Sequence, residues 1–398
     1  MNKTTRTNNR ALSAIKEFIS MESFGGVLLL FTTILALIIA NVESIAPIYH
    51  SFWNSSFGFV FEGFSASLTM QKWVNDVLMA IFFLSIGLEI KKEMLIGNLA
   101  NAKKAAFPII AAFGGMILPI CIYFSVNFGG EYTHGFGIPM ATDIAFALGI
   151  ILLLGKRVPI ELKIFLVTLA VVDDLGAIVI IALFYSGGIE ISYLLSAIFV
   201  FLALFSLNRF GIKSITVYII GGIFLWYFVH HSGIHATIAG VLLAFTVPLR
   251  AEIISRSPLM RLERTLNPLS AYFIMPVFAF ANAGVTIGGE FAINSITIGV
   301  FLGLVVGKPL GIFLFTFLSE KFGIAKKHEN LSWMHILGAG FLGGIGFTMS
   351  IFIATLTFGG SLLAEAKITI MVSSLIATII GVLFFKFVLF KVKKTKEI

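Results

Sequence analysis

Long apolar segments alternate with short polar ones along almost the whole chain. Each apolar segment approaches or exceeds the roughly 20 residues that an α-helix needs to cross a bilayer. Twelve can be distinguished: Phe24 to Asn41, Trp73 to Leu88, Ala105 to Asn127, His134 to Leu154, Ile160 to Tyr185, Ser192 to Leu207, Ser214 to Val229, Gly233 to Pro248, Leu269 to Val285, Ile296 to Leu318, Met334 to Phe358 and Ile368 to Leu389. The pattern predicts an all-α polytopic membrane protein with twelve transmembrane helices.

The positive charges test this count. With a cytoplasmic amino terminus, the loops assigned to the cytoplasm hold almost all of the Lys and Arg: Lys91, Lys92, Lys103, Lys104, Lys156, Arg157, Lys163, Arg209, Lys213, Arg250, Arg256, Arg261, Arg264, Lys321, Lys326 and Lys327. The opposite side holds only Lys72 and Lys367. Because positive charge marks cytoplasmic loops, we expect both termini inside, with tails at about 1–23 and 390–398.

Composition narrows the class further. Of the 398 residues, 58% are hydrophobic and 12% are charged, whereas soluble domains are about 25% charged. A soluble enzyme is therefore excluded. The net charge of +8 follows from topology and from attraction to anionic lipid rather than from nucleic-acid binding. We expect one transmembrane domain over residues 1–398, without a cofactor, and we expect the longest loop, Val42 to Lys72, to pack at the membrane interface.

Charged side chains inside apolar segments are costly and mark functional sites. The adjacent pair Asp173–Asp174 lies near the middle of its segment. Neighbouring residues on a helix point about 100° apart, so one carboxylate is expected to face a water-filled cavity and the other a neighbouring helix. Na⁺ and H⁺ compete for carboxylate oxygens, and this competition alone supports cation/proton exchange. The alternative is a pair neutralised for packing.

Two further buried charges accompany this pair. Lys308 is also in mid-segment, and we expect it to pair with one of the aspartates as a structural clamp, a proton carrier or both. Asp143 follows Gly137, Pro139 and Thr142, which predict a helix starting in mid-membrane, where an Asp offsets the positive amino end. A Gly-rich interruption, Gly338 to Gly346, breaks the eleventh segment, although close helix packing also explains such glycines.

The remaining candidates lie nearer the membrane surfaces. Asp76, near the outer end of the second segment, either lines a funnel or extends to water. His235 either titrates near physiological pH or forms a hydrogen bond at a helix end. On the cytoplasmic side, either a solvated rim or a pH-responsive network is formed by Glu89, Lys91, Lys92, Glu93, Glu252, Arg256, Arg261, Glu263 and Arg264.

Several strings resemble the NhaA-type bacterial sodium/proton antiporters, and together they extend over nearly the whole chain. They are WVNDVLMAIFFLSIGLEIKKE (73–93), MATDIAFALG (140–149), VVDDLGAIVIIALFY (171–185), SGIHATIAG (232–240), FAFANAGV (278–285), GKPLG (307–311) and GIGFTMSIFIA (344–354). The resemblance implies twelve helices in inverted repeats, with two interrupted helices crossing near the midplane. The family is itself a standard example of transporters built in this way.

The same resemblance implies roles for individual residues. Asp173 and Asp174 would form the Na⁺/Li⁺ and proton site, with Lys308 paired to Asp173. Thr142 and Asp143 would belong to the crossing of the interrupted helices. By position, Glu89, Lys92, Glu93 and Glu263 would belong to the pH-sensing region, and Asp76 to the outer funnel. Arg264 and Asn267 occupy positions where family members can carry histidines, so the pH at which activity changes is left open.

These residues predict a secondary antiporter that exchanges cytoplasmic Na⁺ or Li⁺ for external H⁺ in the bacterial inner membrane, regulated by pH. The resemblance also suggests a homodimer. Two alternatives are a cation channel without proton coupling and an intramembrane aspartyl protease. The protease requires two carboxylates that face each other, whereas Asp173 and Asp174 are adjacent on one helix and point apart.

Overall fold

The structure is a computed structural model that describes residues 24–61, 64–130, 132–155, 158–250, 253–287 and 293–396. The predicted amino-terminal tail 1–23 and the loop residues Lys156, Arg157 and Glu252 lie outside the described residues. The last helix continues to Lys396, into the predicted carboxyl-terminal tail at about 390–398.

The fold is almost entirely helical, as the apolar pattern predicts. The first described helix is Phe24–Asn41. The others are α2 (Ala46–Asn54), α3 (Met70–Lys72), α4 (Met79–Ile96), α5 (Ala102–Asn127), α6 (Ile144–Leu153), α7 (Ile160–Phe184), α8 (Ile191–Arg209), α9 (Ile215–His231), α10 (Ile238–Thr246), α11 (Pro258–Leu269), α12 (Met275–Asn282), α13 (Ser295–Leu302), α14 (Lys308–Lys321), α15 (Trp333–Gly343), α16 (Phe347–Thr357) and α17 (Gly360–Lys396).

Several of these helices continue one another. Wider π-helical turns at Trp73–Leu78, Ser270–Ile274 and Gly303–Gly307 join α3 to α4, α11 to α12 and α13 to α14. Short 3₁₀ segments lie at Asn98–Ala100, Thr133–Met140 and Ile254–Arg256. The segment Thr133–Met140 and α6 together occupy the fourth predicted span.

Among the described residues, eight helices are long and apolar enough to cross a membrane, or nine if the bent pair α15–α16 counts as one span. The chain is thus a polytopic membrane protein, and the number twelve stays a prediction. The other three predicted spans correspond to shorter or more polar helices. These are α9, the short α10, and α11–α12, whose first half carries Arg261, Glu263 and Arg264.

The segment predicted as an interfacial loop contains regular structure. Strands β1 (Ser56–Phe61) and β2 (Phe64–Thr69) form an antiparallel hairpin that pairs Ser56 with Thr69 and Phe61 with Phe64. The preceding helix α2 is anchored because the Tyr49 hydroxyl donates a hydrogen bond to the carbonyl of Phe280. Burial raises the pKa of Tyr49 to about 12, so this hydroxyl keeps its proton.

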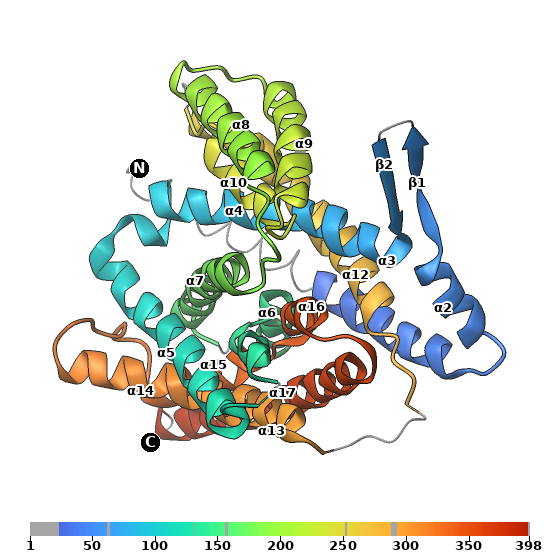
Figure 1. Ribbon diagram of the computed structural model, residues 1–398. Coiled ribbons are helices and arrows are strands. Elements are labelled where there is room, and N and C mark those ends of the chain that lie inside the picture. The colour runs from blue at the N-terminus through green and yellow to red at the C-terminus, as the bar shows by residue number, and fades with distance from the viewer. Residues whose placement is uncertain are drawn as a thin grey trace.

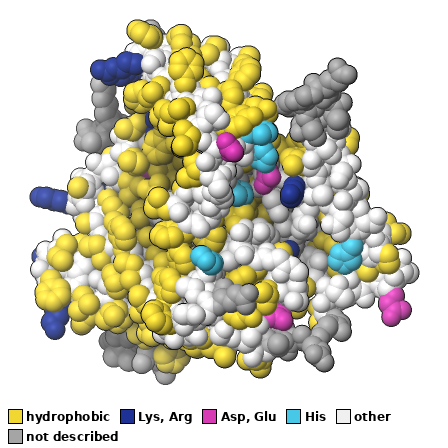
Figure 2. Space-filling view, in the orientation of Figure 1, with side chains coloured by type: hydrophobic (Ala, Val, Ile, Leu, Met, Phe, Trp, Pro, Cys, Tyr) yellow, Lys and Arg dark blue, Asp and Glu magenta, His cyan; other side chains and the backbone are white. Residues whose placement is uncertain are grey.

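The helices form two hydrophobic clusters. Buried residues of α5, α7 and α14 to α17 belong to the larger one, whereas α8 to α11 share a second cluster with one face of α4. Figure 1 shows α8, α9 and α10 gathered apart from α5, α13, α14 and α17. Hydrophobic side chains cover much of the face seen in Figure 2, as expected for a surface in contact with lipid.

The helices α5 and α14 cross at a pair of glycines. A Cβ on Gly114 would lie 2.2 Å from the carbonyl oxygen of Gly311, and a Cβ on Gly311 would lie 2.1 Å from that of Gly114. Both contacts are with backbone, so no side chain can move aside. Small residues permit this close approach in lipid, where packing rather than the hydrophobic effect joins helices. The crossing fixes α14, and therefore Lys308, against the core.

We expect Gly311→Ala to separate α5 from α14 and to lower the free energy of unfolding by about 1–3 kcal/mol, the usual cost of overpacking. Thermal unfolding of the purified protein in detergent measures this loss. Gly188→Ala is the control, because a Cβ at Gly188 meets no atom within 4 Å. Equal melting temperatures for both variants would show that the helices tolerate the added methyl group.

Candidate cation and proton site

Two interrupted helices meet at their breaks. The fourth predicted span is interrupted at 141–143, and the eleventh is bent by 44° between α15 and α16. The Thr142 hydroxyl donates to the carbonyl of Gly343 at 2.9 Å. The amide of Asp143 donates to the carbonyl of Ile345 at 2.6 Å. Backbone groups that the breaks leave without helical partners thus bond across the junction, as buried backbone in a membrane requires.

The local sequence explains both interruptions. Pro139 lacks the N–H that a continuing helix needs. On the other side, a Cβ on Gly344 would lie 2.4 Å from the carbonyl oxygen of Leu304, so only glycine permits this approach to the π-helical turn before α14. A further bond joins the spans, because the Ser350 hydroxyl donates to the carbonyl of Ile138 at 2.7 Å.

Asp143 caps the amino ends of two helices at once. Its Oδ1 accepts a hydrogen bond from the amide of Phe146 in α6 at 3.2 Å. Its Oδ2 accepts from the amide of Thr348 in α16 at 3.1 Å and from the Thr348 hydroxyl at 2.5 Å. The side chain is almost completely buried. A carboxylate at this position offsets the partial positive charge of both helix ends.

Lys308 provides the opposite charge at the opposite kind of helix end. It is fully buried at the start of α14. Its Nζ donates to the carbonyl of Met140, the last residue of the 3₁₀ segment, and to Oδ2 of Asp173 at 2.7 Å. The structure therefore pairs Lys308 with Asp173 rather than with Asp174, and places the ammonium at a carboxyl end, where positive charge is favoured.

The two adjacent aspartates of α7 face different surroundings. Asp173 is 1% exposed and points to Lys308, and its second oxygen, Oδ1, is buried without a hydrogen bond to any described residue. Asp174 is 7% exposed and lines a cavity beside the two breaks. This is the division that helix geometry predicts for neighbouring residues, one facing a helix and the other a cavity.

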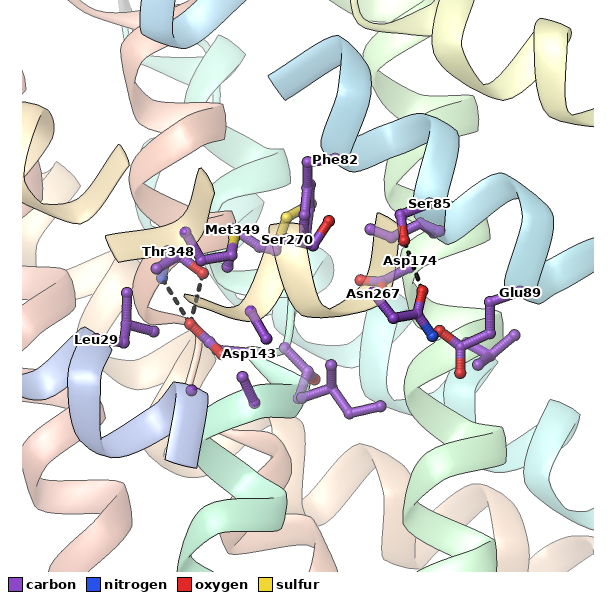
Figure 3. Close-up of a pocket in the computed structure, with 18 residues that line it drawn as sticks. Leu29, Phe82, Ser85, Glu89, Asp143, Asp174, Asn267, Ser270, Thr348 and Met349 are labelled. Carbon is purple, nitrogen blue, oxygen red and sulfur yellow. Dashed lines mark hydrogen bonds between the residues drawn. The ribbon is translucent and has the colours of Figure 1, made fainter. Parts of the chain in front are cut away.

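The cavity has a volume of about 60 Å³, whereas one water needs roughly 10–15 Å³. Figure 3 shows Asp174, Asn267 and Glu89 at one end of the cavity and Asp143 with Thr348 at the other. In the described chain, no three His, Cys, Asp or Glu side chains are placed to share a metal ion. A cation at Asp174 would therefore complete its coordination with neutral oxygens and water.

Polar groups that the sequence analysis did not assign to the ion site also line the cavity. The Ser85 hydroxyl donates to Oδ1 of Asn267 at 2.7 Å and so joins α4 to α11. Both residues line the cavity, and Figure 3 shows Asn267 directly beside Glu89. Ser85 precedes Glu89 by one helical turn. Because Ser85 is a polar residue in an apolar segment, the sequence could have identified it as a candidate site residue. The sequence analysis also missed Thr348, the partner of Asp143.

The predicted cytoplasmic residues separate into distinct groups. Glu89 faces the cavity. Lys92 of α4 and the buried Glu263 of α11 form an ion pair. Glu93 instead accepts a hydrogen bond from the amide of Asn98 at 2.7 Å, and Arg264 is exposed. The structure therefore brings Lys92 and Glu263 together but assigns Glu93 to a local turn.

At the other end of the α3–α4 helix, the structure brings together two residues that the sequence analysis treated separately. Oδ1 of Asp76 lies 3.9 Å from Nε2 of His235. The Nδ1 atom of His235 lies 2.8 Å from the Thr237 hydroxyl, just before α10. His235 thus makes the helix-end hydrogen bond that was one of its two interpretations, and Asp76 faces this imidazole.

Buried charges at the junction of two interrupted helices define the class of secondary transporters whose ion sites lie at broken helices. Similarity to known proteins identifies the family within this class. The family model described as "Na+/H+ antiporter 1" matches residues 16–385, and the chain belongs to this family.

Relatives of similar length carry the corresponding name. The chain is 48% identical to the "Na(+)/H(+) antiporter NhaA" of Helicobacter acinonychis (strain Sheeba), covering 95% of this chain and 96% of the relative. It is 49% identical to "Na(+)/H(+) antiporter NhaA 2" of Helicobacter hepaticus (strain ATCC 51449 / 3B1), covering 94% and 96%. The value is 51% for "Na(+)/H(+) antiporter NhaA 2" of Aliarcobacter butzleri (strain RM4018), covering 93% and 96%.

We expect Lys308→Ala to lower the free energy of unfolding by about 3–5 kcal/mol, because it leaves Asp173 buried without its partner. Thermal unfolding in detergent measures the loss, and we expect the pH dependence of activity to change as well. The double variant Lys308→Met with Asp173→Leu is the control, because it removes both charges and should recover most of the stability. If the single variant melts like the wild type, the pair does not stabilise the junction.

Proposed function

We propose that the protein exchanges Na⁺ for H⁺ across a bacterial membrane and that Asp174 is the carboxylate to which the two ions bind in turn. One observation carries this proposal. Asp174 opens to a cavity at the junction of two interrupted helices that is also lined by Ser85 and Asn267, while its neighbour Asp173 is held by Lys308. The names of the relatives with 48% to 51% identity support the choice of ions.

Competition for one carboxylate provides the coupling. Ionised Asp174 attracts a small cation, whereas protonated Asp174 is neutral and attracts the cation only weakly. Loading of Na⁺ therefore requires loss of the proton, and rebinding of a proton expels Na⁺. The hydroxyl of Ser85 and the amide oxygen of Asn267 lie on the same cavity, where they can replace part of the hydration shell. Oxygen ligands of this kind suit hard cations.

The Asp173–Lys308 pair contributes differently. The ammonium neutralises Asp173, so that Asp174 is the one of the two adjacent aspartates that is free to bind an ion. In this arrangement Lys308 is a structural clamp. The alternative is that Lys308 also releases a proton during the transport cycle. Asp143 remains capped by two helix ends and holds the junction together rather than binding the transported ion.

Access to Asp174 would alternate between the two sides of the membrane. The breaks at 141–143 and 344–346 are joined by individual hydrogen bonds rather than by continuous helix, which makes them suitable pivots. We further propose that Na⁺ or Li⁺ leaves the cytoplasm while external protons enter through the inner membrane, with both termini cytoplasmic. The distribution of Lys and Arg supports this orientation. The family likeness supports a homodimer embedded in lipid.

We expect Asp174→Asn to abolish Na⁺-dependent proton release from proteoliposomes while leaving the folded protein intact, because an amide cannot alternate between a proton and a cation. A pH-sensitive dye inside the vesicles measures the exchange. Glu190→Gln removes an exposed carboxylate away from the cavity and should exchange normally. Normal exchange by Asp174→Asn would disprove the assignment, and wild-type Na⁺ flux without proton movement would indicate a channel.

We also propose that pH regulates the exchange through the ion pair of Lys92 and Glu263. The pair joins α4 to α11, the helices that carry Ser85, Glu89 and Asn267. The other charged groups that face it are Glu89 and Glu93. Protonation of this cluster would loosen the contact between α4 and α11 and so change access to the cavity.

We expect Glu263→Gln to make the exchange rate vary less with pH, because a neutral amide replaces the charged partner of Lys92. The measurement is the rate of dye dequenching in proteoliposomes between pH 6 and 9. Glu190→Gln, which changes an exposed carboxylate at the start of α8, is the matched control. An unchanged pH profile for Glu263→Gln would remove this pair from regulation without affecting the assignment of Asp174.

A further inference from the structure

A second cavity lies outside the ion site. It has a volume of about 550 Å³ and shares no lining residue with the cavity of Asp174. Three parts of the chain form its walls: the first turns of α5, the first turns of α7, and the segment between α14 and α15. By the distribution of Lys and Arg, this end of the helices lies on the cytoplasmic side of the membrane.

Positive charge predominates around this cavity. Lys103 and Lys104 of α5 and Lys326 and Lys327 of the α14–α15 segment line it, against two acidic residues, Glu161 and Glu329. Glu161 already accepts a hydrogen bond from the Asn330 amide at 2.8 Å. Lys327 lies 3.9 Å from Glu320. Among the described residues, Lys103, Lys104 and Lys326 have no acidic side chain within ion-pair distance.

The inner wall of the cavity is apolar. Phe107 and Pro108 of α5, Phe165 of α7 and Leu331 are buried residues that line it. Unpaired ammonium groups above an apolar wall suit an amphiphile, because a phosphate can contact the lysines while glycerol and the first acyl carbons cover the apolar side chains. A free phosphate would use only the lysines. Basic pockets between helices on the cytoplasmic side are suited to anionic lipid headgroups.

We propose that this cavity binds the headgroup of an anionic phospholipid, with Lys103, Lys104 and Lys326 contacting its phosphate. The bound lipid would touch the elements that carry the ion site. The helix α7 bears Asp173 and Asp174, and the lysine-bearing segment connects α14, which begins with Lys308, to the broken helix α15. Lipid in the cavity would therefore hold α5, α7 and the α14–α15 segment in one arrangement.

The test measures melting of the whole purified protein in detergent with added phosphatidylglycerol, phosphatidylcholine, or phosphatidylcholine plus inorganic phosphate. For the wild type, we expect phosphatidylglycerol to raise Tm by roughly 2–4 °C relative to phosphatidylcholine. The variant Lys103→Gln/Lys104→Gln/Lys326→Gln should lose most of this shift, and the same three lysines changed to Arg should keep it.

A matched control removes equal charge elsewhere. Lys213, Arg256 and Arg261 are exposed and do not line the cavity. The variant Lys213→Gln/Arg256→Gln/Arg261→Gln should keep the full shift. An equal loss in this control would show that diffuse surface charge attracts the lipid, and would overturn the site. A Tm shift of the same size with inorganic phosphate would indicate that the cavity binds a soluble anion rather than a lipid. This result would also overturn the proposal.

A second measurement tests the site in case the triple Gln variant does not fold. Native mass spectrometry of the wild type and of the triple Arg variant should show retained phosphatidylglycerol and no retained phosphatidylcholine under equal conditions. Equal retention of both lipids, or no shift in Tm with phosphatidylglycerol, would overturn the site. None of these readouts depends on ion exchange, so they are independent of the outcome for Asp174→Asn.

Discussion

The fold depends on satisfying backbone groups where two helices are interrupted inside the membrane. Each break exposes amides or carbonyls that lipid cannot hydrogen-bond. The structure meets this constraint with two charged side chains. Asp143 accepts hydrogen bonds from the amino ends of α6 and α16, and Lys308 donates one to the carboxyl end of the 3₁₀ segment. Because Lys308 also binds Asp173, the capping of the breaks and the setting of the acidic pair are parts of one network.

This network explains why the two adjacent aspartates have different surroundings. Asp173 is committed to Lys308, whereas Asp174, one residue further along α7, faces the cavity. In the proposed exchange, a site with two free carboxylates would carry more negative charge, and it would therefore release a bound cation less readily. A site with both paired would not bind it. The helical rotation between neighbouring residues thus gives two identical side chains different surroundings, one paired with Lys308 and one facing the cavity.

Much of this arrangement could be predicted from the sequence because charges in apolar segments are conspicuous. Asp143, Asp173, Asp174 and Lys308 were identified in this way, and the different orientations of the acidic pair followed from helix geometry. The pairing of Lys308 with Asp173 was expected as well, whereas the uncharged partners could not be predicted. Thr348 lies 205 residues from Asp143, and Asn267 lies 182 residues from Ser85, and such contacts leave no local pattern.

The departures in the fold have local causes. The hairpin was missed because Val42 to Lys72 was interpreted as one interfacial loop, although the alternation of Phe57, Phe59 and Phe61 is typical of a strand. The count of twelve spans exceeds the described helices that meet the length and hydropathy of a span because α9 and α10 are short and the helix through α11 and α12 is too polar.

The double cap on Asp143 also has a consequence for biogenesis. The chain leaves the ribosome from its amino end, so α6 enters the membrane long before α16 is translated. Until then, Asp143 lacks the hydrogen bonds of Thr348. The junction is therefore completed late, when most of the polypeptide has been synthesised, and truncation before Phe347 would leave Oδ2 of Asp143 without the donors that it has in the folded protein.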